Sequence, residues 1–159
     1  MRRVLIAAAC ALVTVIGSTS LAVAAGEDPV VGTWQLNVSK SKFTAGPAVK
    51  SQTRTYSQSE GGISLLMKSV GADGKESTTT TTYHLDGKTY PITGNADYDN
   101  LSATRVNSHT AKFALKRGGK VVGHTTRTVS KDGKTLTATT NLTAPNGEKT
   151  DSVLVFDRQ

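Results

Sequence analysis

Hydrophobic and polar residues alternate along most of the chain after residue 30, in short segments. In 134–143 one side of an extended strand would carry the apolar and small residues Leu136, Ala138, Thr140 and Leu142. The segments 111–115 and 63–67 alternate in the same way. A period of two residues with one polar side is typical of an antiparallel sheet that has one face in water.

Turn signals punctuate this alternation, most of them about ten to fifteen residues apart. They are Gly61-Gly62, Asp73-Gly74, Asp86-Gly87, 97–100, Gly118-Gly119, Asp132-Gly133 and Asn146-Gly147. Glycine, Asn and Asp adopt the backbone conformations that tight hairpins require. We therefore predict about ten strands, near 30–38, 49–59, 62–70, 76–85, 88–92, 100–107, 110–117, 120–130, 134–143 and 149–157.

The predicted fold is all-β, an antiparallel up-and-down barrel of about 8–10 strands, because closing such a series removes its exposed edges. No segment after Ala25 has a sustained helical period, and 39–47 has room for one short turn. Aromatic residues are few, and many inward positions would hold Thr, Ser or Ala. Such a sparse lining favours an internal cavity over a filled interior.

The first 25 residues have the pattern of a cleaved signal peptide. Arg2 and Arg3 precede an apolar run from Val4 to Ile16, and small residues follow as far as Ala25. The run is shorter than the roughly 20 residues of a membrane span. We expect export to the periplasm or beyond the cell, leaving 26–159 as a single domain without a membrane span.

Removal of the signal peptide changes both the charge and the available chemistry. The net charge falls from +7 to +5, and the only cysteine, Cys10, is lost. Lipidation of Cys10 is an alternative, although the apolar run continues past it. Because residues 26–159 contain no cysteine, thiol chemistry is excluded from the domain. The lysines are scattered near turns, which indicates a soluble surface, so no nucleic-acid partner is expected.

No catalytic or metal-binding motif stands out, and we expect neither an enzyme nor a bound cofactor or metal. The three histidines, His84, His109 and His124, form no close pair. The acidic residues fall mostly in turns, where bonding to the backbone is their commonest role. No Gly-x-Ser-x-Gly elbow and no phosphate-cradling glycine loop occur.

Two short motifs resemble those of the calycins, the superfamily of lipocalins and fatty-acid-binding proteins. Gly32-Thr33-Trp34 is similar to their glycine-x-tryptophan opening, and Ser41-Lys42-Phe43 and the last strands are similar to the fatty-acid-binding group. The mature chain also resembles a group of small exported bacterial proteins of unassigned function. The resemblance implies that Gly32 and Trp34 form the barrel floor, with a basic side chain stacked on the tryptophan.

The chain also departs from the fatty-acid-binding pattern. The segment 39–47 is too short for the two lid helices of that group. The resemblance implies a carboxylate clamp made by one arginine on a late strand and an arginine-x-tyrosine pair on the last strand. Arg127 matches the first position, but Leu154 and Phe156 occupy the other two. Fatty-acid binding therefore does not follow from the resemblance.

Three arginines, Arg54, Arg105 and Arg127, are predicted on strands, and the alternation turns Arg105 and Arg127 inward. A buried arginine needs a partner. The partner is either an anionic ligand or, more often, a structural group that helps close the barrel. The residues predicted to line or cap a ligand cavity are Arg105, Arg127, Tyr56, Met67, Tyr83, Tyr90, Phe113 and Phe156.

The leading hypothesis is an exported, lipocalin-like binding protein for a small apolar or amphipathic ligand. The alternative is a filled barrel that acts as an interaction or inhibitor module of the cell envelope, with lysine-bearing loops as its contacts. A protein partner is not identified by the sequence. Interior volume separates the two hypotheses, because only the first requires a cavity.

Overall fold

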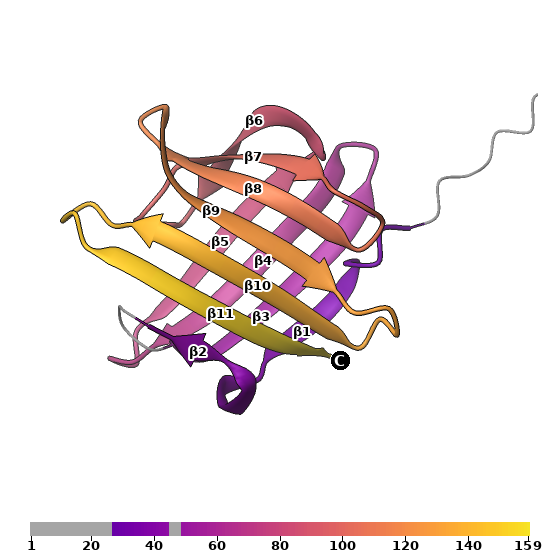
Figure 1. Ribbon diagram of the computed structural model, residues 1–159, viewed down its shortest axis with the longest axis horizontal. Helices are drawn as coiled ribbons and strands as arrows, with labels where there is room; N and C mark the ends of the chain where they lie inside the picture. Colours follow the sequence, from indigo (N-terminus) through magenta and orange to yellow (C-terminus); the bar gives the residue numbers. More distant parts are fainter. Residues whose placement is uncertain (1–26, 45–48) are drawn as a thin grey trace, which may run out of the picture.

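Ten strands follow one another up and down and close into a barrel in the computed structural model, which describes residues 27–44 and 49–159 (Figure 1). The barrel strands are β1 (Gly32–Leu36), β3 (Val49–Ser59), β4 (Gly62–Gly71), β5 (Glu76–Tyr83), β6 (Asp86–Thr93), β7 (Asn100–Arg105), β8 (Thr110–Arg117), β9 (Lys120–Val129), β10 (Thr135–Thr143) and β11 (Lys149–Arg158). The predicted all-β, antiparallel up-and-down barrel is confirmed. The predicted signal peptide and Cys10 lie outside the described residues.

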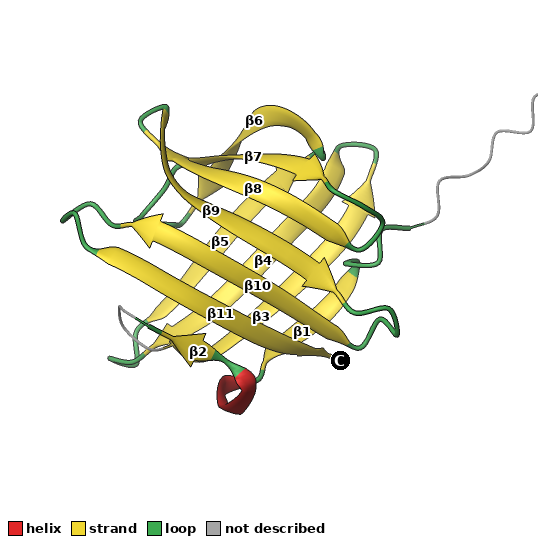
Figure 2. Cartoon of the chain, viewed as in Figure 1, coloured by secondary structure: helices red, strands yellow, loops and turns green. Residues whose placement is uncertain are grey.

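The segment in which only a short turn was predicted contains two small elements. These are η1 (Val38–Lys40), a single 3-10 turn, and β2 (Lys42–Phe43), which appear below the barrel in Figure 2. Asn37 caps η1, because its side-chain oxygen accepts a hydrogen bond from the Lys40 amide. β2 then pairs with β11, where Phe43 lies opposite Ser152. No lid helices cover the barrel in the described part of the chain.

The barrel closes where β1 pairs with β11. Trp34 lies opposite Arg158 on one side of β1 and opposite Arg54 of β3 on the other. Leu36 lies opposite Phe156. The closure therefore brings together residues from opposite ends of the sequence, and it leaves neither β1 nor β11 as a free edge.

Of the neighbouring strands in the barrel, β5 and β6 have the fewest paired residues. Only Thr80 with Thr93 and Thr81 with Ile92 are in register. Threonine side chains add to this seam. The Thr79 hydroxyl donates to the Gly94 carbonyl at 3.2 Å, and the Thr81 hydroxyl donates to the Pro91 carbonyl at 2.8 Å. Side-chain bonds thus replace part of the missing backbone ladder.

Gly94 allows this seam to close, and we expect Gly94→Ala to weaken it. A Cβ at Gly94 would collide with the Thr78 carbonyl, and the backbone φ is +79°. Gly74→Ala is a matched control, since its φ is +81° but nothing lies within 4 Å. The control should cost about 1 kcal/mol of unfolding free energy, and Gly94→Ala about 1–3 kcal/mol more. Denaturant unfolding measures both, and equal losses would show that the collision has no effect.

The two ends of the barrel differ. The closed end consists of residues 28–32 and the turns that follow β3, β5, β7 and β9. The open end consists of the turns that follow β4, β6, β8 and β10, together with β2. Fully buried side chains concentrate toward the closed end, among them Trp34, Tyr83, Leu136 and Phe156. No helix formed by the described residues is long and apolar enough to cross a membrane.

Candidate functional site

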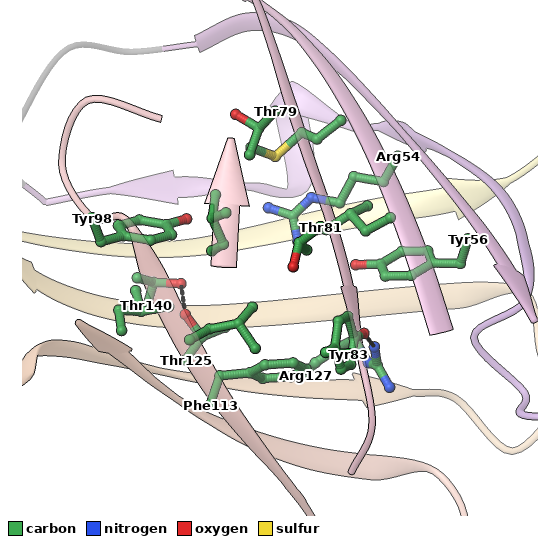
Figure 3. Close-up of a pocket in the computed structure, with 15 residues that line it drawn as sticks. Arg54, Tyr56, Thr79, Thr81, Tyr83, Tyr98, Phe113, Thr125, Arg127 and Thr140 are labelled. Atoms are coloured by element: carbon green, nitrogen blue, oxygen red, sulfur yellow. Dashed lines mark hydrogen bonds between the residues drawn. The ribbon is translucent and has the colours of Figure 1, made fainter. Parts of the chain in front are cut away.

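An interior cavity of about 80 Å³ lies within the barrel (Figure 3). Aromatic rings, aliphatic side chains, threonine hydroxyls and two arginines line it. The lining residues are Arg54, Tyr56, Leu65, Met67, Thr79, Thr81, Tyr83, Ile92, Tyr98, Leu101, Phe113, Leu115, Thr125, Arg127 and Thr140. They come from most of the strands, because alternate residues of each strand face inward.

A second hollow of about 290 Å³ lies at the open end of the barrel. Its apolar lining includes Phe43, Val49 and Leu154, and polar residues such as Asp97 lie along it as well. Four residues line both hollows: Arg54, Met67, Tyr98 and Thr140. The interior cavity and the outer hollow are therefore adjacent, and Arg54 lies where they meet.

Arg54 is held in place from two sides. Its Nε donates to the Gln52 side-chain oxygen at 2.8 Å, and Gln52 in turn donates to the Ser69 hydroxyl at 2.8 Å. The Arg54 guanidinium lies 4.4 Å above the centre of the Phe156 ring. No carboxylate lies within 4.0 Å of Arg54 among the residues that the structure describes. Its charge is therefore not neutralised by a close ion pair.

The other inward arginine, Arg127, belongs to a cluster at the closed end. Its side chain is 5% exposed, and one terminal nitrogen donates to the Tyr83 hydroxyl at 2.6 Å. The other terminal nitrogen lies 3.9 Å from Asp28. Asp28 accepts a hydrogen bond from Arg105 at 2.7 Å and another from the Val30 amide at 2.9 Å. One buried carboxylate is thus shared by two arginines.

Tyr83 stays neutral in this cluster. Burial raises the pKa of the Tyr83 hydroxyl above its ordinary value, even though the neighbouring Arg127 guanidinium acts in the opposite direction. The neutral hydroxyl accepts the Arg127 hydrogen bond, and the Tyr83 ring also packs edge-on against Phe113, with centroids 5.5 Å apart. The Nε of Arg127 is buried and has no partner among the described residues. Among the described residues, the Tyr83 hydroxyl is the one acceptor within hydrogen-bond distance of the Arg127 side chain, because Asp28 lies 3.9 Å away.

We expect Tyr83→Phe to destabilise the protein by about 1–3 kcal/mol, because it leaves a terminal nitrogen of a buried guanidinium without an acceptor. Tyr90→Phe is the matched control. It removes the same atom from a hydroxyl that bonds Asp86 at 2.9 Å in an exposed setting, so its effect should stay within about 0.5 kcal/mol. Thermal and denaturant unfolding report both changes. A loss no larger than that of the control would contradict the assigned role of Tyr83.

The floor of the barrel is a stack of Trp34 and Arg158. Trp34 is fully buried and its indole nitrogen donates to the Val30 carbonyl at 2.7 Å. The Arg158 guanidinium lies 4.2 Å from the centre of the Trp34 ring and donates to the Val31 carbonyl at 2.7 Å and to the Pro29 carbonyl at 2.5 Å. At Gly32 a Cβ would come within 2.5 Å of this guanidinium. The structure thus places the predicted floor residues, Gly32 and Trp34, under one arginine.

Five of the eight predicted ligand-binding residues line the interior cavity: Tyr56, Met67, Tyr83, Phe113 and Arg127. The other three do not. Arg105 lies at the end of β7, where its side chain is 45% exposed and bonds Asp28 from outside the cavity. Tyr90 bonds Asp86 at the surface, and Phe156 is fully buried beneath Arg54. Arg105 is the last residue of β7 and follows Leu101 and Ala103 on the same face, but its side chain reaches Asp28 at the closed end and does not line the cavity.

Sequence reasoning missed part of the lining. The inward threonines Thr79, Thr81, Thr125 and Thr140 were not among the predicted site residues. The signal was present for Thr79 and Thr81, which share a face with Tyr83 on β5. Tyr98 lies outside the strands, so no alternation could place it. Arg54 was recognised as a candidate arginine but was not assigned to the cavity.

The turn carboxylates bond the backbone. Asp73, Asp86 and Asp132 each accept a hydrogen bond from the amide of the lysine two residues later, at 3.0, 3.0 and 3.1 Å. These bonds lower the pKa of Asp73 and Asp86, and for Asp132 the Ser130 hydroxyl contributes most. Among the described residues no three His, Cys, Asp or Glu side chains gather as a metal site. The carboxylates therefore stabilise hairpin turns.

No family model matches the chain, and no curated protein matches it. Among solved structures, it is similar to zebrafish ileal bile acid-binding protein complexed with cholic acid, with a TM-score of 0.49 and 8% identity over 82% of this chain and 99% of that one. It is also similar to the siderocalin Ex-FABP, described as functioning through dual ligand specificities, with a TM-score of 0.38 and 12% identity over 82% and 74% of the two chains. These overlaps are too loose to support an argument about ligand or activity.

Proposed function

We propose that the protein is an exported binding protein for a small apolar or amphipathic molecule, which enters the barrel at its open end. The observation that carries this proposal is the pair of adjacent hollows that share Arg54, Met67, Tyr98 and Thr140. Concave, mostly apolar surfaces with a few polar groups are the usual form of a small-molecule site. At the closed end Trp34 stacks with Arg158, and a hollow of about 180 Å³ beside Asp28 shares only Tyr83 with the interior cavity, so the open end offers the wider junction.

The volumes limit the size and position of the ligand. Ligand pockets commonly span roughly 300–1,000 Å³. The interior cavity, at about 80 Å³, is well below that range, whereas the outer hollow, at about 290 Å³, is close to its lower end. We therefore place most of the ligand in the outer hollow, with only a small part of it inside.

Export is the second element of the proposal. It is supported by the signal-peptide pattern of residues 1–25 and by the lack of cysteine in 26–159. A domain without disulfides depends on its own core. The buried closed end, with Trp34 and Phe156 at its centre, supplies such a core.

The small interior also favours the second candidate function, a filled barrel that acts as an interaction or inhibitor module in the cell envelope. Buried aromatic residues and the Asp28 cluster occupy much of the barrel toward its closed end. In that case the contacts would come from the turns, several of which carry a lysine, such as Lys75, Lys88 and Lys134. Binding of a small molecule separates the two functions.

Native mass spectrometry of protein purified from its source tests the proposal, together with displacement of a fluorescent lipid. We expect a co-purified small molecule and a mass that lacks the first 24 or 25 residues. Thr140→Phe fills the junction of the two hollows and should abolish the adduct and the displacement. Thr139→Phe, on the exposed outer face of the same strand, should change neither. No adduct and no displacement with the unaltered protein would favour the filled-barrel function.

A further inference from the structure

We propose that Arg54, at the junction of the two hollows, and Tyr56, on the wall of the interior cavity, form an anion-binding pair, and that the ligand is a small amphipathic molecule with one negative charge. This inference rests on the proposed function, because it names the class of ligand for the same site. The two residues stand two positions apart on β3, so their side chains leave the same face of the strand. Figure 3 shows both pointing into the cavity.

The first argument is charge. Arg105 and Arg127 share Asp28, and Arg158 is surrounded by three carbonyl oxygens. Arg54 has only the neutral Gln52 and the face of Phe156. Residues 1–26 and 45–48, which the structure does not describe, contain no Asp or Glu that could pair with it. A partly buried cation without a counter-charge attracts an anion strongly, since the surrounding dielectric is low.

The second argument is the Tyr56 hydroxyl. Tyr56 is 3% exposed and lines the interior cavity. The Tyr56 hydroxyl has no hydrogen-bond partner among the described residues, and it is not one of their fully buried unpartnered atoms, which are His109 Nδ1 and Arg127 Nε. It therefore stays accessible from the cavity that Tyr56 lines. A ligand oxygen held by Arg54 would supply the missing acceptor. The guanidinium and the phenol therefore complement the same anionic group.

The third argument is orientation. The Nε of Arg54 is engaged by Gln52, and the guanidinium plane packs on Phe156, so the two terminal nitrogens remain for a ligand. Terminal guanidinium nitrogens bind the two oxygens of a carboxylate or sulfonate in parallel. The apolar part of the ligand then extends along Phe43 and Leu154 toward the open end.

The charge of the ligand follows from what surrounds Arg54. Among the described residues, Arg54 is the one cation that lines both hollows, which matches a single negative charge. Asp97 lies on the outer hollow, and its carboxylate would oppose a second negative charge along the path to the open end. A monoanion with an apolar body therefore fits better than a dianion.

A pair of fluorescent probes tests this inference in the purified mature protein. The anionic probe is 1-anilinonaphthalene-8-sulfonate, and the neutral probe is N-phenyl-1-naphthylamine, which has the same ring system without the sulfonate. Arg54→Gln should weaken binding of the anionic probe by about tenfold or more and leave binding of the neutral probe within about twofold. The neutral probe also reports that the variant still folds.

Lys68→Gln is the matched control. Lys68 is exposed on β4 and neighbours the register position of Arg54, which lies opposite Met67. The control removes the same charge from the outside of the wall and should change neither affinity. The inference would be overturned if Arg54→Gln lost affinity equally for both probes. It would also be overturned if Arg54→Gln and Lys68→Gln lost the same affinity for the anionic probe. If neither probe binds the unaltered protein, the proposed function itself fails.

Tyr56→Phe decides the matter if Arg54→Gln does not fold. This substitution removes one oxygen and keeps the ring that packs in the wall. We expect it to lower the affinity for the anionic probe about threefold, the effect of one modest hydrogen bond, and to leave the affinity for the neutral probe unchanged. Unchanged affinity for both probes would rule out the Tyr56 hydroxyl as part of an anion site.

Discussion

Trp34→Ala is expected to lower the unfolding free energy by about 3–5 kcal/mol, the range observed when a large aromatic side chain is removed from a core. Trp34 is fully buried, bonds the Val30 carbonyl and carries the Arg158 guanidinium on its ring. Its removal leaves a large cavity in the floor and deprives Arg158 of its stacking partner. Chemical denaturation, monitored by circular dichroism, measures the loss.

Val106→Ala provides the comparison for that measurement. Val106 is 51% exposed, between β7 and β8 at the same end of the barrel, so its truncation should cost less than about 0.5 kcal/mol. If Trp34→Ala lost as little as this control, the stack would not be the structural floor. A second readout is proteolysis of residues 28–32, which Trp34 and Arg158 tie to the barrel.

Asp28→Asn is expected to cost about 2–3 kcal/mol. Removing one partner of a buried ion pair typically costs about 3–5 kcal/mol, and the smaller figure allows for the partial exposure of Arg105. The substitution keeps the shape of the side chain, and an oxygen remains available to the Val30 amide. It removes the only carboxylate within 4.0 Å of Arg105 and Arg127 among the described residues. Two like charges then face each other without compensation.

Asp151→Asn is the matched control for this change. Asp151 is exposed, and none of the ion pairs among the described residues includes it. The same substitution there should alter the unfolding free energy by less than about 0.5 kcal/mol. An Asp28→Asn variant as stable as this control would mean that the Tyr83 hydrogen bond and the surrounding rings suffice for Arg127.

Much of the barrel could be predicted from the sequence because its signals are local. Asp-Gly-Lys turns such as 132–134 set the hairpins, and alternation sets which side of each strand is buried. β2 escaped prediction because two residues cannot show a period. Pairing Phe43 with Ser152 depends on contacts more than 100 residues apart in the sequence, and no local pattern encodes them.

The candidate site was harder to predict, because its chemistry depends on which charges meet. Alternation placed Arg105 and Arg127 on the inward faces of β7 and β9, but only Arg127 lines the cavity. It could not show that Asp28, a residue before the first strand, would satisfy both of them. Once Asp28 is paired with Arg105 and Arg127, Arg54 remains as the arginine of the cavity lining that has no carboxylate within 4.0 Å among the described residues. This result depends on the partners of every arginine, which the sequence does not show.

The pairing of β1 with β11 has a consequence for the order in which the chain assembles. Every other ladder of the barrel joins strands that are neighbours in the sequence, apart from the two-residue contact of β2. Such ladders form early, because short loops cost little entropy to close. From the sequence separation of the two strands we expect Trp34 to meet Arg158 last, after the intervening strands have paired. Until β1 pairs with β11, both strands are unpaired edges of the sheet, and pairing with another copy of the chain competes with closure of the barrel.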